Sequence, residues 1–186
     1  MPAELPRHRV RELISSEAIQ RRVAELAAQI DRDYRGSRDL VVIGVLKGAV
    51  PFFATLVQRL DLPVLVDFFQ TASYGAGTNA GEIRIKRDID LAIRGRDVLL
   101  VEDIVDTGWT LRTILDLFRF RGARSVKLCA LLDKHEARET EVPIDYCGFR
   151  IGREFVVGFG LDYAERYRNL PYIGVIEFID EKEAPS

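Results

Sequence analysis

Four short, mainly apolar runs constrain the fold of this 186-residue chain more than any other feature. They cover residues 40–46, 64–69, 98–101 and 126–132. Runs of this length and composition indicate strands that are covered on both faces, as the strands of parallel sheets are. Helical patterns lie between most of them. Strands that alternate with helices predict an α/β fold with a mainly parallel central sheet flanked by helices.

Three stretches have the sequence signals of helices. Ser16 is the expected N-cap of the first, which runs to about Tyr34 and has apolar residues at helical spacing. Pro51 suits the first position of the second helix, which runs to about Leu60. The third is amphipathic and ends near Arg121, because a glycine follows there.

The chain is expected to form a single domain over residues 1–186, with a core over 16–135. Beyond this core the pattern changes to short strands and loops. Residues 140–186 and 1–15 are therefore expected to form a small hood over the carboxyl edge of the sheet. Residues 70–90 combine small polar residues with alternating charges, which predicts a flexible lid arm.

The balance of charge and hydrophobicity excludes several classes of protein. A net charge of −2, from 27 basic and 29 acidic residues, lacks the basic excess of a nucleic-acid-binding protein. No apolar stretch approaches the roughly 20 residues that span a bilayer, and the N-terminus has no signal-peptide pattern. We therefore expect a cytoplasmic protein without nucleic-acid or membrane partners. Cys129 and Cys147 are expected to be buried thiols of a reducing compartment, although two cysteines could also form a disulfide.

The run over residues 98–110 joins one of the apolar strands to a helix through a tight, glycine-containing turn. Thr107, Gly108 and Thr110 offer hydroxyl groups and unhindered amides at the N-terminus of that helix, an arrangement that binds phosphate. A simpler explanation is a capped helix with Asp106 or Thr107 as its N-cap. The turn alone does not separate these two explanations.

Two carboxylates, Glu102 and Asp103, follow the apolar residues of this strand and precede the turn. They would repel a phosphate, so the ligand is expected to carry hydroxyl groups, a metal or developing positive charge beyond its phosphate. Carboxylates accept hydrogen bonds from a diol and are hard oxygen ligands for Mg²⁺. A pair of solvated residues at a strand end is the alternative.

The whole string over residues 98–110 resembles the signature of the phosphoribosyltransferases, enzymes that bind 5-phosphoribosyl 1-diphosphate. The resemblance implies the type I phosphoribosyltransferase fold, with its hood and lid. It also implies that the loop at 106–110, which includes Trp109, binds the 5′-phosphate. Glu102 and Asp103 would then face the ribose hydroxyls and Mg²⁺. Nothing in the sequence gives the Trp109 side chain a role of its own.

Two segments of the C-terminal third, one ending in Lys134 and one beginning with Phe155, resemble the hypoxanthine-guanine subfamily of these enzymes. Taken singly, Lys134 would be interpreted as a solvated lysine and Phe155 as a core residue. The resemblance implies instead that Lys134 donates to the 6-oxo group of a purine and that Phe155 stacks on the base. It further implies that the backbone near Val156 and Asp162 binds the other edge of the base. Asp162 would also hold a second Mg²⁺ through water.

The same resemblance implies that Asp106 takes part in the chemical step of the reaction. It would handle the proton on purine N7 while N9 attacks the anomeric carbon of the ribose. A carboxylate with a pKa of about 4 is a weak base. We therefore expect burial or the neighbouring carboxylates to raise the pKa of Asp106.

The resemblance assigns the remaining residues either to binding of the diphosphate or to the lid. The loop expected to bind the diphosphate contains Leu46, Lys47 and Gly48. In the family this loop often has a cis peptide before its basic residue. Ser73 and Tyr74 match the tip of the lid, which excludes water. Arg168 matches a basic residue that reaches the diphosphate, with an ordinary surface arginine as the alternative.

These assignments imply a role in purine salvage. The reaction is Mg²⁺-dependent transfer of the phosphoribosyl group to N9 of hypoxanthine or guanine, which gives IMP or GMP and diphosphate. The resemblance also implies a homodimer or a homotetramer. Two alternatives remain open: a phosphoribosyltransferase that prefers xanthine or a pyrimidine, and a regulator of the same fold that senses phosphoribosyl diphosphate and binds RNA or DNA. The chain has neither the basic face nor the extra domain of such regulators, which favours the enzyme.

Overall fold

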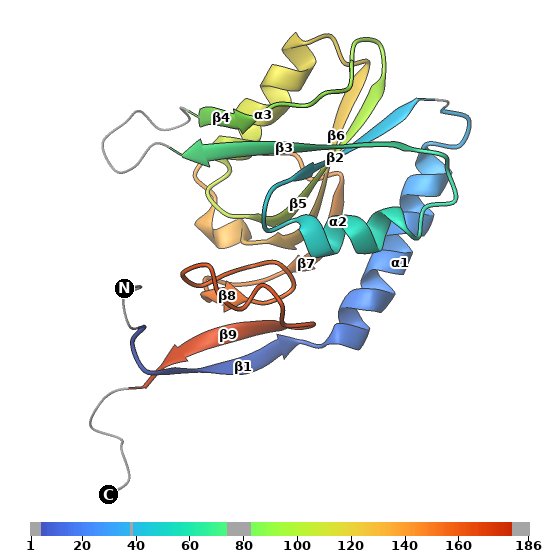
Figure 1. Ribbon diagram of the computed structural model, residues 1–186. Coiled ribbons are helices and arrows are strands. Elements are labelled where there is room, and N and C mark those ends of the chain that lie inside the picture. The colour runs from blue at the N-terminus through green and yellow to red at the C-terminus, as the bar shows by residue number, and fades with distance from the viewer. Residues whose placement is uncertain (1–4, 38, 74–82, 180–186) are drawn as a thin grey trace, which may run out of the picture.

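The computed structural model describes residues 5–37, 39–73 and 83–179. Within them, six strands form a central sheet in the order β4-β3-β2-β5-β6-β7, and three form a small sheet in the order β1-β9-β8 (Figure 1). The central strands are β2 (Leu40–Val45), β3 (Leu65–Ser73), β4 (Ile83–Arg87), β5 (Asp97–Val105), β6 (Ser125–Asp133) and β7 (Tyr146–Arg150). The small sheet contains β1 (His8–Ile14), β8 (Val156–Val157) and β9 (Ile173–Phe178). The helices are α1 (Ser16–Asp33), α2 (Val50–Val57), α3 (Trp109–Phe120) and a short 3₁₀ helix, η1 (His135–Ala137).

The central sheet is mainly parallel, as the apolar runs predict. β2 pairs in parallel with β3 and β5, and β6 pairs in parallel with β5 and β7. Of the described strands in this sheet, β4 alone runs antiparallel, at the edge beside β3. All six residues of β2 are buried. Helices α1 and α2 cover one face of the sheet, and α3 covers the other. The predicted α/β fold is confirmed.

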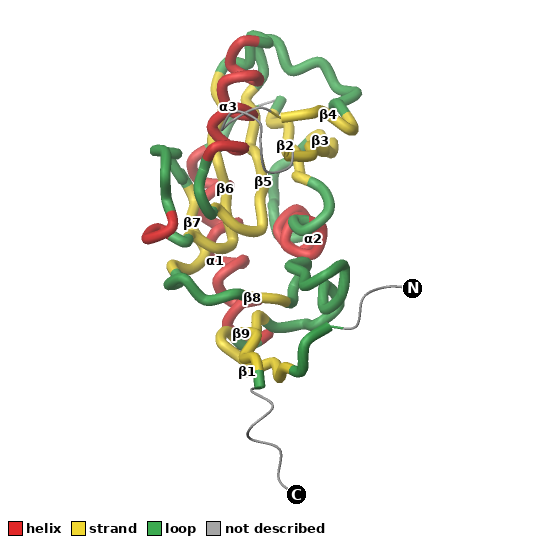
Figure 2. Tube along the Cα trace, turned by 90° about the vertical axis from the view of Figure 1, so that its left-hand side faces the viewer, coloured by secondary structure: helices red, strands yellow, loops and turns green. Residues whose placement is uncertain are grey.

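The small sheet is antiparallel and lies at the end of the central sheet where β5 and β6 finish (Figures 1 and 2). We call it the hood, together with the loop between β8 and β9. The N-terminal arm contributes β1, which pairs with β9. The boundary expected at residue 140 differs from the structure, because β7 pairs with β6 and belongs to the central sheet.

Two helix ends differ from expectation by a few residues. The N-cap of α1 is Ser15 rather than Ser16, and the Ser15 hydroxyl accepts a hydrogen bond from the Ala18 amide at 3.2 Å. Two adjacent serines offer the same chemistry, and the chain geometry selects the first. Helix α2 ends at Val57 instead of near Leu60.

The end of β5 differs in a way that matters for the site. The strand continues to Val105 because its parallel ladder with β6 continues to Asp133. Glu102 and Asp103 therefore lie inside the strand rather than after it. Successive side chains of a strand alternate between its two faces, but the carboxyl groups of Glu102 and Asp103 still lie close enough to interact with each other.

The antiparallel pair β3–β4 forms the base of the expected lid arm. Ser73 ends β3, whereas Tyr74 lies outside the described residues. Asp67 ties this base to the following segment, because Oδ2 of Asp67 accepts hydrogen bonds from the Asp90 amide at 2.7 Å and the Leu91 amide at 2.9 Å.

The two cysteines lie in neighbouring strands without a disulfide. Cys129 is buried, which raises the pKa of its thiol, and Cys147 is partly buried. The burial expected for both cysteines is found at Cys129, whereas Cys147 lies nearer the surface. In the described part of the chain, no helix is long and apolar enough to cross a membrane.

Candidate active site

The turn between β5 and α3 leaves the N-terminus of α3 without a side-chain cap. Gly108 occupies the N-cap position with a φ of +93°, a left-handed conformation that residues with side chains rarely adopt. A Cβ at this position would also lie 2.9 Å from the carbonyl oxygen of Thr140. Because neither Asp106 nor Thr107 caps the helix, the capped-helix explanation is wrong. The N-terminal amides and the dipole of α3 are available to an anion.

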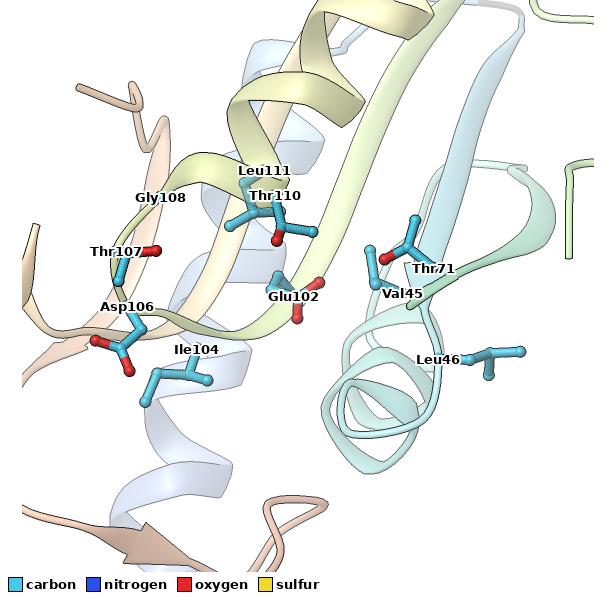
Figure 3. A pocket seen from close by; sticks show the side chains of 10 residues that line it. All are labelled: Val45, Leu46, Thr71, Glu102, Ile104, Asp106, Thr107, Gly108, Thr110 and Leu111. Atoms are coloured by element: carbon cyan, nitrogen blue, oxygen red, sulfur yellow. The ribbon is translucent and has the colours of Figure 1, made fainter. Parts of the chain in front are cut away.

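A cavity of about 310 Å³, the first cavity, opens at this turn (Figure 3). Residues of β5, α3 and their turn line it together with the ends of β2 and β3: Val45, Leu46, Thr71, Glu102, Ile104, Asp106, Thr107, Gly108, Thr110 and Leu111. Figure 3 shows Glu102 between the turn that carries Thr107 and the β2 end that carries Val45. The anion site and one carboxylate thus share a cavity, as a ligand with a phosphate at one end and hydroxyls further along requires.

Glu102 and Asp103 lie where a negative charge is unfavourable. Oε2 of Glu102 is buried and has no hydrogen-bond partner. Burial, followed by the charge of Asp103, raises the pKa of Glu102 well above its usual value. Burial also raises the pKa of Asp103. A buried carboxylate oxygen without a partner is costly, so a cation or a hydroxyl donor would be favourable here. This burial excludes the alternative interpretation of Glu102 and Asp103 as two solvated residues at the end of a strand.

A second cavity, of about 220 Å³, joins the ends of β5 and β6 to the hood. Its lining residues are Asp103, Ile104, Asp106, Lys134, Phe155, Val156, Leu161 and Asp162. The structure therefore brings together all the residues assigned to the purine: Lys134, Phe155, Val156 and Asp162. Phe155 is 46% exposed and packs edge-on against Tyr163, with ring centroids 5.4 Å apart. An aromatic ring that is supported at its edge and open elsewhere can stack on a flat ligand.

Asp106 and Lys134 approach each other at this second cavity. Nζ of Lys134 lies 3.9 Å from Oδ2 of Asp106. The lysine side chain is only 11% exposed, so it is not the solvated lysine of the alternative interpretation. The Asp106 side chain is 54% exposed. The burial expected for Asp106 is therefore not found, because the residue lies past the end of β5.

The loop at residues 46–48, which we call the diphosphate loop, is fixed by close contacts to glycine. The Leu46–Lys47 peptide is cis. A Cβ on Gly48 would lie 1.7 Å from Oδ2 of Asp103, and a Cβ on Gly160 would lie 1.9 Å from the Gly48 carbonyl oxygen. Glycine at both positions lets this loop lie between a site carboxylate and the hood.

Arg168 lies in the hood and shares a partner with Lys47 of the diphosphate loop. One guanidinium nitrogen donates to the Gly160 carbonyl at 2.8 Å. The other lies 2.8 Å from Oδ1 of Asp162 and 3.3 Å from Oε2 of Glu165. Nζ of Lys47 lies 3.0 Å from that same Glu165 oxygen. Arg168 is therefore not an ordinary surface arginine, and it shares one carboxylate oxygen with Lys47.

Comparison with known proteins places the chain in a family. Residues 10–164 match the model of the phosphoribosyl transferase domain. The chain belongs to the phosphoribosyltransferase family. The resemblance seen in the sequence and the predicted type I phosphoribosyltransferase fold are both confirmed.

Several phosphoribosyltransferases are similar over most of the chain. It is 49% identical over 166 residues to the hypoxanthine-guanine phosphoribosyltransferase of Bacillus subtilis strain 168. The matched residues make up 89% of this chain and 92% of that protein. It is also 49% identical to the bifunctional protein TilS/HprT of Listeria monocytogenes serotype 4b (strain F2365), but it spans only 26% of that protein's length.

Solved structures agree with these relatives. The hypoxanthine-guanine phosphoribosyltransferase of Bacillus anthracis, which has a HEPES molecule in its active site, superposes with a TM-score of 0.85 at 45% identity, covering 88% of this chain and 96% of that one. The hypoxanthine phosphoribosyltransferase of Trypanosoma cruzi superposes with a TM-score of 0.87 at 39% identity, covering 95% of each chain.

The carboxylates of this phosphoribosyltransferase fit a metal that binds together with its substrate. Within the described ranges, no group of three or more acidic, histidine or cysteine side chains could hold a metal alone. The unpartnered Oε2 of Glu102 and the adjacent Asp103 offer hard oxygen ligands. Asp162 already contacts Arg168 and accepts a hydrogen bond from the Glu165 amide at 2.8 Å. Mg²⁺ commonly takes one or two carboxylates and completes its shell with water and substrate phosphates.

Six residues of this phosphoribosyltransferase site were not anticipated from the sequence, and two of them, Val45 and Leu111, line the first cavity. Ile104 and Leu161 line the second cavity. Each is the sequence neighbour of an assigned residue, Asp103 for Ile104 and Asp162 for Leu161, and that adjacency is the sequence signal that could have indicated them. Thr71 lines the first cavity, and Glu165 contacts Lys47 and Arg168. No local signal marks these two, because they reach the site only through the order of the strands and the path of the hood loop.

Proposed function

We propose that the protein transfers the phosphoribosyl group of 5-phospho-α-D-ribose 1-diphosphate to N9 of hypoxanthine or guanine, giving IMP or GMP and diphosphate. The observation that carries this proposal is the junction of the two cavities at the end of β5. Glu102 lines the first cavity, Asp103 lines the second, and Asp106 lines both. An anion site and an aromatic, lysine-containing site thus meet beside three carboxylates. Relatives named for this activity support the assignment.

The first cavity suits the ribose 5-phosphate part of the donor. The N-terminal amides of α3 and the hydroxyls of Thr107 and Thr110 would donate hydrogen bonds to the phosphate. Glu102 and Asp103 would accept hydrogen bonds from the 2′- and 3′-hydroxyls. As the bond to diphosphate breaks, positive charge develops at the anomeric carbon. Carboxylates fixed nearby stabilise that charge.

The second cavity suits a 6-oxopurine. Lys134 donates a hydrogen bond to the 6-oxo group, whereas a 6-aminopurine would present a second donor to the same lysine. Phe155 stacks on the base, and the backbone around Val156 and Asp162 binds its opposite edge. The selection against adenine follows from the cost of leaving two donors facing each other in a largely buried site.

Asp106 performs the proton transfer of the reaction. The electron pair of purine N9 forms the bond to the anomeric carbon, and the diphosphate leaves with the pair of the bond that breaks. Asp106 accepts the proton that N7 loses. Its position at the junction of the two cavities and its 3.9 Å separation from Lys134 Nζ support this role.

Mg²⁺ is the divalent cation that we propose for this site. Glu102 and Asp103 would hold it, and Asp162 would hold a second ion through water. When bound, the metal neutralises the diphosphate and makes it a better leaving group. The cation would also offset the negative charge that Glu102 and Asp103 bring close to the diphosphate, beside the positive charges of Lys47 and Arg168. Chelation with EDTA is expected to abolish activity and added Mg²⁺ to restore it. Activity that persists in EDTA would contradict the proposal.

The lid and the assembly complete the proposal. Ser73 and Tyr74 would lie at the tip of a lid that excludes water from the activated ribose. We also propose a cytosolic homodimer or homotetramer that has no nucleic-acid or membrane partner.

A panel of five bases tests the function directly. Guanine, hypoxanthine, xanthine, adenine and uracil are each supplied with phosphoribosyl diphosphate and Mg²⁺, and nucleotide formation is followed by chromatography. We expect turnover of hypoxanthine and guanine and none of adenine or uracil. Xanthine carries the same 6-oxo group, but the named relatives do not favour an enzyme that prefers it. Five silent bases would contradict the proposal and favour a regulator.

A further inference from the structure

Glu165 occupies the place where two cations of the proposed diphosphate site converge. Its Oε2 lies 3.0 Å from Nζ of Lys47 and 3.3 Å from a guanidinium nitrogen of Arg168. One carboxylate oxygen that contacts an ammonium and a guanidinium group at once has the surroundings of a phosphate oxygen. Hydrogen bonds from Lys47 and then from Arg168 hold the pKa of Glu165 below its usual value, so the group is ionised at neutral pH.

The two cations are held by Glu165 to different degrees. Arg168 has independent partners, the Gly160 carbonyl at 2.8 Å and Asp162 Oδ1 at 2.8 Å. For Lys47, Glu165 is the sole ion-pair partner among the described residues. Arg168 therefore keeps its position when Glu165 moves away, whereas Lys47 becomes free to follow a ligand.

The backbone aims the Glu165 carboxylate at this point. Glu165 has a φ of +63° and its neighbour Ala164 a φ of +50°, left-handed conformations that non-glycine residues seldom adopt. Oδ2 of Asp162 accepts a hydrogen bond from the Glu165 amide at 2.8 Å. Tyr163 and Arg166 close the turn with two backbone hydrogen bonds, each of 3.1 Å. The side chain itself is two-thirds exposed, so it can leave without disrupting a packed region.

We propose that Glu165 is an internal counter-ion, which holds Lys47 and Arg168 in the free protein and is displaced by the diphosphate group of the donor. The inference rests on the proposed function, since it assumes that these two cations bind diphosphate. Glu165 then acts as a positioning residue through Lys47 and Arg168. It competes with the diphosphate of the donor and assists release of the diphosphate product.

The Glu165→Gln variant tests this competition. Isothermal titration of inorganic diphosphate in the presence of Mg²⁺ compares the full-length variant with the unaltered protein. Because exposed ion pairs are individually weak, we expect diphosphate to bind about threefold to tenfold more tightly to the variant. The KM for phosphoribosyl diphosphate should fall by a similar factor, and the KM for guanine should not change. A merely structural role would not separate the two KM values in this way.

Two further variants make the test robust. Glu165→Gly removes the carboxylate and suits the left-handed backbone, so it replaces Glu165→Gln if that variant folds poorly. Glu25→Gln is the matched control, because Glu25 forms an exposed ion pair with Arg22 at 2.7 Å on α1. Diphosphate affinity should be unchanged in this control.

The outcomes separate the inference from the proposed function. Unchanged or weaker diphosphate binding in both Glu165 variants, in a protein that turns over guanine, overturns the counter-ion alone. Failure of every form to bind diphosphate, together with five silent bases, overturns the counter-ion and the proposed function together. Tighter binding in the variants supports the counter-ion, even where the unaltered protein binds diphosphate too weakly to measure.

Discussion

The loop at residues 106–110 and the diphosphate loop at residues 46–48 are both proposed to bind anions, but different contacts hold the two loops in place. The first belongs to one continuous strand–turn–helix unit, in which Gly108 sets the turn and the helix supplies its own amides. The second lies between Asp103 and the hood, and its cation pairs with a glutamate that is distant in sequence. The first is complete in the free protein, whereas the second is already occupied by a side chain.

This difference matches the fates of the two groups in the proposed reaction: the 5′-phosphate stays bound to the ribose, and the diphosphate is released. A 5′-phosphate stays on the ribose throughout the proposed reaction, so a rigid, permanently open site suits it. Diphosphate must arrive with the donor and leave as product. A site that has a competing carboxylate of its own binds such a group less tightly and releases it sooner.

The Asp106→Asn variant should lose most of its turnover. An amide cannot accept the N7 proton, and general-base catalysis typically contributes about 10²–10⁴-fold, so kcat should fall by about that factor. The melting temperature should change little, because the side chain is 54% exposed. Steady-state kinetics and calorimetry check both statements. Asp116→Asn on the outer surface of α3 is the control. A near-normal kcat in the Asp106 variant would show that Asp106 does not accept the N7 proton. The loop at residues 106–110 would then have a role in binding only.

Replacing Phe155 should affect the purine and not the donor. Stacking of a base on an aromatic ring contributes about 1–3 kcal/mol, so Phe155→Ala should raise the KM for guanine about 5-fold to 100-fold. The KM for phosphoribosyl diphosphate should stay within about twofold, since Phe155 lines the second cavity and not the first. Phe120→Ala serves as the control, because Phe120 is 89% exposed on α3. An equal rise in both KM values would mean that the two cavities do not bind different substrates.

Glu102→Gln should stabilise the free protein while impairing catalysis. Because the pKa of Glu102 is raised in the folded state, its ionisation at neutral pH costs stability. That cost disappears as the pH falls toward the unfolded-state pKa of about 4.5. The variant should therefore unfold with a free energy about 1–3 kcal/mol larger at pH 7, with the difference shrinking toward pH 5.

Denaturant titrations at the two pH values measure this difference between the variant and the unaltered protein. Mg²⁺ with phosphoribosyl diphosphate should raise the melting temperature of the unaltered protein more than that of the variant. A variant that is less stable at pH 7, or a difference that grows on acidification, would contradict the unfavourable charge inferred at β5.

Trp109 should report on the phosphate end of the site alone. It is the single tryptophan of the chain, it begins α3, and its Nε1 donates to Glu139 at 3.0 Å. Saturating phosphoribosyl diphosphate should change its fluorescence, whereas inorganic diphosphate should change it much less. An unchanged spectrum with the donor would place the phosphate elsewhere. Equal responses to both ligands would mean that the two ends of the site are coupled.

Much of the fold could be predicted because its signals are local. The apolar runs and the helix periodicity establish the order of strands and helices, and the spacing of Thr107, Gly108 and Thr110 indicates the anion site. The same information misplaced the end of β5, because that end is determined by the ladder with β6 and not by the polarity of Glu102 and Asp103. Strand pairing across the sheet overrides local composition here.

The parts that could not be predicted depend on contacts between distant segments. The pairing of β1 with β9 builds the hood from both ends of the chain. The exposure of Asp106 follows from where β5 ends, and the contact of Glu165 with Lys47 follows from the path of the hood loop. Lys134 and Phe155 lie in segments that resemble a known family, and that resemblance rather than any local pattern placed them beside one base.

The products of a single reaction show whether the protein transfers the ribose to a purine or to water. Hypoxanthine, phosphoribosyl diphosphate and Mg²⁺ are incubated with the protein, and the products are quantified by chromatography and mass spectrometry. The two cavities that meet at β5 predict one IMP and one diphosphate for each donor consumed, with almost no ribose 5-phosphate. Ribose 5-phosphate as the main product would show that water, not a purine, receives the ribose, and would contradict the purine site at Lys134 and Phe155.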